Sequence, residues 1–214
     1  MAGRKKNPEK TAATRNALLE KSYELFVSKN IEDVSMQEIA RECGYGTMTL
    51  YRYYNTKPKL VVAVATHKWK QFSEENQKRR PSVNFEGMTS ADIFEFYLES
   101  FIVLYRSNKD LLRFNQFFNV YIQSENVDEK DLQPYQGIID ILKERFHIIY
   151  SKAKEDNTIR TDEPEEEMFS ITLHLMLAAV TRYAVGLVYI PEKGFDDERE
   201  LEKMKQALLI MYKT

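Results

Sequence analysis

Apolar residues recur at helical spacing along almost the whole chain, and no segment alternates with the period of two that a strand requires. In the longest example, apolar residues follow one another at intervals of four and three positions and so lie on one face of a helix. They are Tyr135, Ile139, Leu142, Phe146, Ile149 and Ala153. Seven glycines and six prolines in 214 residues are too few for a sandwich, barrel or propeller, which need a turn roughly every ten residues. We therefore predict an all-α fold of about nine helices.

The composition narrows the class of protein. A hydrophobic fraction of 43% is enough to bury a core, and 30% charged residues argue against a simple membrane protein. Neither of the two common glycine-rich phosphate loops occurs in the sequence. The single cysteine excludes an internal disulfide and a cysteine-based zinc site, so we expect a cytoplasmic protein without a metal or other cofactor.

The stretch Met168–Ile190 is apolar enough to raise a membrane-spanning alternative. His174 and Arg182 lie inside it, and a central arginine costs roughly 2.5–3.5 kcal/mol on insertion scales. We therefore predict a helix of residues 165–190 that is buried on all sides within a soluble bundle, and no membrane partner.

Positive charge concentrates at the amino end. Residues 1–60 carry eleven Lys and Arg against seven Asp and Glu, whereas the remainder is acidic. The first fifteen residues hold Arg4, Lys5, Lys6, Lys10 and Arg15 against Glu9 alone. No apolar segment follows, so these residues do not form a secretory signal. The asymmetry suggests a cationic head that contacts an anion, although a solvated terminus would look the same.

Two short helices with a tight turn between them are predicted near the amino end. A first helix of residues 14–28 ends at Asn30, and Ser35 with Glu38 forms a capping box before a second helix of residues 36–43. Gly44-Tyr45-Gly46 provides a three-residue turn, and a third helix covers residues 47–54. This is the helix-turn-helix arrangement, whose second helix enters the major groove of DNA.

The segment Val34–Leu60 resembles the N-terminal DNA-binding domain of the TetR/AcrR family of transcriptional regulators. The matching elements are Ile39-Ala40, Gly44-Tyr45-Gly46, Thr49-Leu50-Tyr51, Tyr53-Tyr54, Thr56-Lys57 and Leu60. The resemblance covers about residues 12–62. It implies a DNA-binding domain over residues 10–68, a helical regulatory domain over residues 69–214, and a regulator rather than an enzyme.

The same resemblance assigns DNA contacts to positions on and around the third helix. They are Gln37, Thr47, Met48, Thr49, Tyr51, Arg52, Tyr53 and Lys57. Lys57 matches the family's phosphate-binding lysine, and Tyr51 the tyrosine that contacts the DNA backbone. The fork of Arg52 suits guanine O6 and N7, but a phosphate contact is equally compatible with it. Gly46 replaces the common serine cap and removes one hydroxyl.

Family resemblance further implies a homodimeric repressor that binds a pseudo-palindromic operator in double-stranded DNA and releases it when a small inducer binds. Expected dimer residues lie on the last two helices: Phe169, Leu173, Val180, Leu187, Leu201, Met204, Leu208 and Met211. Aromatic residues gather in the middle of the chain and suggest a lipophilic or aromatic inducer. Expected ligand residues are Tyr97, Phe101, Tyr105, Phe117, Phe118, Tyr121 and His174.

The sequence leaves open two alternatives from other classes of protein, an enzyme and a helical adaptor. Asp196-Asp197-x-x-Glu200 has the outline of a magnesium-diphosphate motif of helical prenyl synthases, although acids also favour the first turn of any helix. No second acidic motif accompanies it. A helical adaptor with a vestigial helix-turn-helix is the other alternative, and the outward Thr, Tyr and Arg side chains argue against it.

Overall fold

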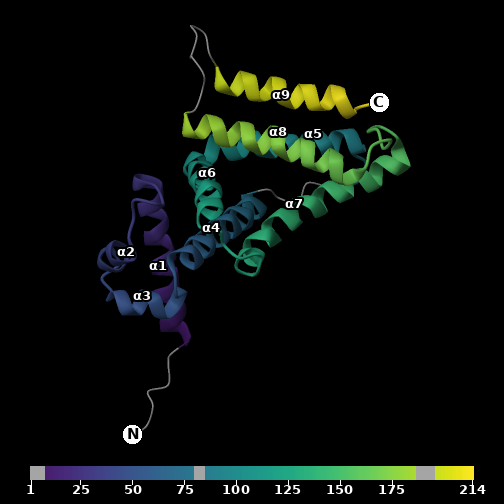
Figure 1. Ribbon diagram of the computed structural model, residues 1–214. Coiled ribbons are helices and arrows are strands. Elements are labelled where there is room, and N and C mark those ends of the chain that lie inside the picture. The colour runs from purple at the N-terminus through teal and green to yellow at the C-terminus, as the bar shows by residue number, and fades with distance from the viewer. Residues whose placement is uncertain (1–7, 80–84, 187–195) are drawn as a thin grey trace. The chain divides into compact units, whose positions relative to one another are not determined.

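The computed structural model describes residues 8–79, 85–186 and 196–214. These residues form nine α-helices and no strand, which confirms the all-α prediction (Figure 1). The helices are α1 (Pro8–Lys29), α2 (Met36–Glu42), α3 (Thr47–Tyr54), α4 (Lys57–Arg79), α5 (Ser90–Ser107), α6 (Lys109–Ser124), α7 (Glu129–Asp156), α8 (Glu165–Val185) and α9 (Asp197–Tyr212).

Local capping chemistry sets several helix ends. Asn30 follows α1 with φ of 67°, the left-handed conformation predicted for it. Thr89 and Asp92 form a complete capping box at the start of α5. α8 ends at Val185, where Gly186 adopts a left-handed cap, and residues 187–190 of the predicted helix lie outside the described residues.

Two compact units share the chain. The first contains Met1–Ser73 and Phe117–Gln136, and the second contains Glu74–Gln116 and Gly137–Thr214. The carboxyl end of α6 and the amino end of α7 therefore belong with the first unit. Pro134 lies inside α7, which begins six residues before the predicted apolar stripe.

An ion-pair cluster ties α1 to α4 in the first unit. The Glu20 carboxylate accepts hydrogen bonds from His67 Nε2 and Lys68 Nζ at 2.8 Å each, and from Gln71 Nε2 at 2.7 Å. Lys68 Nζ also lies 4.5 Å from the centre of the Tyr23 ring. Beneath this cluster the fully buried core includes Leu18, Phe26, Leu50 and Leu60.

The second unit is built on α5, which packs against α8 and α9 (Figure 1). Phe94 contacts Phe146 and Tyr212 edge to face, with ring centres 6.1 and 6.0 Å apart. The carboxyl end of the chain is held by an antiparallel bridge between Ile159 and Lys213. Burial of these rings contributes to the hydrophobic stabilisation of the unit.

α8 is exposed over much of its surface, contrary to the prediction that it is buried on all sides. It is the one helix of the described segments whose length and hydropathy would allow it to cross a membrane, and only 33% of its apolar window is buried. Within one chain α8 is covered where it packs against α5 and α9 and where Phe169 contacts Phe146 of α7.

Candidate nucleic-acid interface

The turn between α2 and α3 has the backbone conformation that its glycines predict. Ser35 caps α2 by accepting a hydrogen bond from Glu38 N at 3.1 Å, but the Glu38 carboxylate pairs with Lys29 Nζ at 2.6 Å instead of completing the predicted box. Gly44 adopts φ of 69°, and Gly46 is the N-cap of α3 without a side-chain hydrogen bond. This turn fixes the direction of α3 relative to α2.

α3 divides into a buried and an exposed face. Leu50 is fully buried and Tyr54 nearly so, and α3 packs against α2, where Ile39 and Ala40 are also buried. The predicted DNA-contact residues lie on the other side. Gln37, Met48, Tyr51 and Arg52 are exposed, and Thr47, Thr49, Tyr53 and Lys57 are half-buried. The first unit therefore presents hydroxyls, an amide and a guanidinium on one accessible surface.

Lys57 has partners within the first unit. Its Nζ donates a hydrogen bond to the Glu32 carbonyl oxygen at 3.2 Å and lies 5.4 Å from the centre of the Tyr121 ring. Burial lowers the pKa of Lys57, and the nearby carboxylates of Glu125 and Glu32 oppose this effect. Sequence reasoning missed Tyr121 as a neighbour of Lys57, because nothing in the local pattern joins positions so far apart.

The predicted ligand residues are divided between the two units. In the second unit Tyr97 and Tyr105 are buried, and their hydroxyls donate to the Leu142 carbonyl and the Asp197 carboxylate. Phe101 is buried beside Tyr97 with ring centres 5.4 Å apart, whereas His174 is exposed on α8. These aromatic side chains form the core of the unit, since each contacts another part of the same core.

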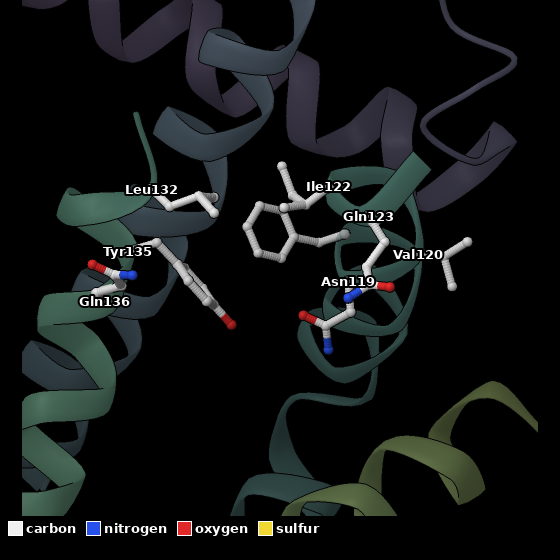
Figure 2. A pocket seen from close by; sticks show the side chains of 8 residues that line it. Asn119, Val120, Ile122, Gln123, Leu132, Tyr135 and Gln136 are labelled. Carbon is white, nitrogen blue, oxygen red and sulfur yellow. The ribbon is translucent and has the colours of Figure 1, made fainter. Parts of the chain in front are cut away.

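A cavity of about 580 Å³ lies instead between the ends of α6 and α7 in the first unit (Figure 2). Of the predicted ligand residues, Phe118 lines it, while Phe117 is half-buried and Tyr121 is buried against Lys57. Periodicity identified the apolar face of α6, but it could not show which part of that face meets α7.

The predicted dimer stripe faces mainly into the second unit. Phe169, Val180, Leu201 and Leu208 are buried within the chain, Leu173 and Met204 are half-buried, and Met211 is exposed; Leu187 lies outside the described residues. The most regular apolar stripe of each helix is the one that packs on α5. Other apolar side chains on these helices remain accessible: Leu175 is 48% exposed and Ile210 is 80% exposed.

The acidic residues at the start of α9 have local partners. Asp196 caps the helix by accepting from Arg199 N at 3.0 Å, and Glu200 accepts a hydrogen bond from the Tyr183 hydroxyl at 2.5 Å. In the parts of the chain that the structure describes, no group of three or more His, Cys, Asp or Glu side chains could hold a metal ion. These contacts favour the helix-capping explanation for Asp196, Asp197 and Glu200.

Comparison with known proteins agrees with this geometry. Residues 18–64 match the family model described as bacterial regulatory proteins, tetR family. An HTH-type transcriptional regulator of Staphylococcus aureus strain USA300 is 24% identical over 189 residues, which are 86% of this chain and 96% of that protein.

Solved structures show the same fold. A TetR transcription regulator from Haloarcula marismortui superposes with a TM-score of 0.68 at 19% identity, covering 95% of this chain and all of the other. The transcriptional regulator FadR from Bacillus subtilis, in complex with stearoyl-CoA, gives a TM-score of 0.64 at 13% identity over 91% and 97% of the two chains.

A helix-turn-helix with a polar outer face, followed by a larger helical body, defines a DNA-binding transcriptional regulator rather than an enzyme. The family model and the relative narrow this class: residues 18–64 match the tetR family of bacterial regulatory proteins, and 86% of the chain is similar to an HTH-type transcriptional regulator.

Proposed function

We propose that this protein is a homodimeric repressor that binds a pseudo-palindromic operator in the cytoplasm and releases it when a small molecule binds. In this proposal residues 10–68 bind DNA, and residues 69–214 provide the ligand site and the dimer surface. The packing of α8 against α5 and α9 supports a place for this helix in a soluble regulator rather than in a membrane.

The observation that carries the proposal is the outer face of α3. A helix inserted into the major groove, which is about 12 Å wide, needs polar side chains that can reach base edges and phosphates. The accessible side of α3 carries Thr47, Thr49, Tyr51 and Arg52. At the centre of the helix, the buried side chain of Leu50 anchors it to the core. Gln37 extends the same surface from α2.

The DNA-contact residues divide into two groups by reach and chemistry. Arg52 is exposed, and its guanidinium lies 5.9 Å from the centre of the Tyr53 ring, which holds it near the helix surface. We assign base contacts to Arg52, Gln37 and the threonines, and phosphate contacts to Lys57 and Tyr51. Exposed Met48 offers an apolar contact for a thymine methyl group.

A twofold-symmetric dimer is expected because one half-site offers a single helix-turn-helix too few contacts. A single helix-turn-helix makes few contacts, and regulators of this class pair to read two half-sites about 34–36 Å apart. Exposed Leu175 on α8 and Ile210 and Met211 on α9 supply apolar surface for pairing. We propose that these side chains, rather than the buried stripe, form the centre of the dimer interface.

A ligand response is supported by two observations. The first is the cavity between α6 and α7, whose volume falls in the range of small-molecule sites. The second is that FadR from Bacillus subtilis, which shares this fold, was crystallised with stearoyl-CoA. The location of the cavity in the same compact unit as α2 and α3 gives a ligand a direct route to the DNA-binding surface.

DNA binding tests the proposal directly. Fluorescence anisotropy with duplexes tiled across the DNA flanking the protein's own coding region should identify one that binds at least a hundredfold more tightly than its scrambled version. Arg52→Ala should reduce this preference by about 1–3 kcal/mol, because a bidentate contact to guanine is lost. Equal weakening on every duplex would remove Arg52 from the base-contact group, and binding to no duplex would contradict the repressor proposal.

A further inference from the structure

We propose that the cavity between α6 and α7 binds an uncharged organic molecule that combines aromatic or alkyl groups with one small hydrogen-bonding group. This inference rests on the proposed ligand response and deepens it, because it names the site and the chemical class of the ligand. It differs from the aromatic core around Tyr97 and Tyr105, whose hydroxyls already donate to the Leu142 carbonyl and the Asp197 carboxylate.

The cavity is lined mainly by apolar and aromatic side chains. They come from the carboxyl end of α6 and the amino end of α7: Phe118, Val120, Ile122, Leu132 and Tyr135. The rings of Phe118 and Tyr135 are in contact, with centres 4.6 Å apart and planes inclined at 49°. An aromatic or alkyl group placed here would bury its surface against both rings, which favours binding.

The polar part of the lining is uncharged. It consists of the Tyr135 hydroxyl and three primary amides, those of Asn119, Gln123 and Gln136. The closest acidic residue in sequence, Asp131, pairs with Lys59 Nζ at 3.2 Å and is therefore already neutralised. A charged ligand would give up part of its hydration against Phe118 and Tyr135 without gaining a counter-charge from the lining, which is unfavourable. The lining thus selects against ions of either sign.

One position in the cavity is suited to a hydrogen-bonding group. Figure 2 shows the Tyr135 hydroxyl and the Asn119 amide facing each other across the opening. Burial raises the pKa of Tyr135 to about 12 despite a hydrogen bond with Trp69, so the hydroxyl is protonated at neutral pH. A small polar group on a ligand can bond to either partner from this position.

The cavity also has an intrinsic reporter. Trp69 is the single tryptophan of the 214 residues, it is 7% exposed, and its indole bonds to the Tyr135 side chain that lines the cavity. A bound aromatic molecule that absorbs near 340 nm should therefore quench Trp69 emission by energy transfer. Because Trp69 lies on α4, the same contact connects the cavity to the helix that carries Lys57.

The matched probes N-phenyl-1-naphthylamine and 1-anilinonaphthalene-8-sulfonate test the inference, because they differ by one sulfonate. We expect the uncharged amine to quench Trp69 with saturation at one molecule per chain, and the sulfonate to bind at least tenfold more weakly. Leu132→Asp should weaken amine binding at least tenfold. Ile148→Asp, the same change at an exposed position of α7 outside the cavity, should leave it unchanged.

A second variant covers the case in which Leu132→Asp does not fold. Asn119 is exposed, so Asn119→Phe should fold, and its ring should fill the cavity and weaken amine binding at least tenfold. The inference is overturned by unsaturable quenching, by sulfonate binding as tight as amine binding, or by equal effects of Leu132→Asp and Ile148→Asp.

Operator binding by the same preparation separates this inference from the proposed function. A protein that binds its operator but not the amine would overturn the cavity assignment and leave the repressor proposal standing. Saturable amine binding by a protein that binds no operator would support the cavity and contradict the repressor proposal.

Discussion

Lys57, which we propose to contact a phosphate, is held in place by partners within the protein. Its ammonium group is bonded to the Glu32 carbonyl and lies against the Tyr121 ring, so its position is restricted while it remains half-buried. Contact with a phosphate would have to replace these partners. The net gain is therefore smaller than that of a fully solvated lysine, but the side-chain entropy lost on binding is smaller as well.

We predict that Lys57→Ala weakens binding to matched and scrambled duplexes by the same factor. A phosphate contact carries no base information, and its loss should reduce the slope of log affinity against log salt by about one. Titrations at several salt concentrations measure both quantities. Lys154→Ala is the matched control, because Lys154 also lies against a tyrosine ring, that of Tyr150, but in the second unit. An unchanged slope in Lys57→Ala would argue against the phosphate contact.

The surroundings of Asp156 lower the pKa of its carboxyl group. Burial alone would raise its pKa, but hydrogen bonds from the Ser90 hydroxyl, the Ser90 N–H and the Thr158 N–H lower the pKa from 3.8 to about 2. The folded protein therefore holds the charged carboxylate more strongly than the unfolded chain does. Its contribution to stability is complete above pH 4 and disappears as the pH falls toward 2.

We therefore predict that Asp156→Asn lowers the free energy of unfolding at pH 7 and that its difference from the unmodified protein closes between pH 4 and pH 2. Urea unfolding followed by circular dichroism at successive pH values measures this difference. Asp140→Asn, at an exposed position of α7, should give a curve parallel to that of the unmodified protein. A constant difference for Asp156→Asn over the same range would exclude the linkage.

Helix ends show which parts of the elements can be predicted from sequence. α3 has the predicted bounds, because Gly44 and Gly46 determine the turn before it. α7 begins at Glu129, six residues before the predicted apolar stripe, and Pro134 lies inside it without ending the helix. A proline in the second turn removes one backbone donor, and its tolerance depends on the packing around it. Local chemistry thus predicts caps and turns better than it predicts helix length.

The capping box of α5 allows a test at this scale. Thr89→Ala removes the hydroxyl that accepts from Asp92 N at 3.2 Å, and we expect it to lower the free energy of unfolding by about 1 kcal/mol. Urea denaturation at pH 7 measures the change. Thr89→Ser retains the hydroxyl and should lie within a few tenths of a kcal/mol of the unmodified protein. Equal losses in the two variants would show that packing of the threonine methyl group, rather than capping, stabilises this end.

At the scale of the whole molecule, sequence periodicity identified helices but not their neighbours. The face of α9 that carries Leu201 and Leu208 is the most regular, and it is buried inside the chain. Isoleucine is also common in the core, so the residue type of Ile210 does not show that it is exposed. Its exposure depends on which face of α9 packs against the rest of the chain. The cavity lined by Phe118 and Tyr135 was missed for the same reason, because it forms only where α6 and α7 meet.

We predict that the double change Leu175→Glu and Ile210→Glu converts a dimer to a monomer. Two carboxylates on apolar surface would lose hydration on pairing, and the cost should exceed 3 kcal/mol, or more than a hundredfold in the dimer dissociation constant. Light scattering after size-exclusion chromatography measures the mass, and operator affinity should fall with it. Ile148→Glu, on an exposed apolar position of α7, is the control and should remain dimeric. A dimer that survives the double change would place the interface elsewhere.

The interleaved path of the chain has a consequence for biosynthesis. Trp69 bonds to Tyr135, and Lys57 lies against Tyr121, so α4 finds these partners only after residues 117–136 have left the ribosome. Until then the nascent chain carries its helix-turn-helix with one flank of α4 uncovered, where chaperones can bind. An isolated fragment that stops at Ser73 would keep that uncovered flank permanently, and added peptide 117–136 should restore its solubility.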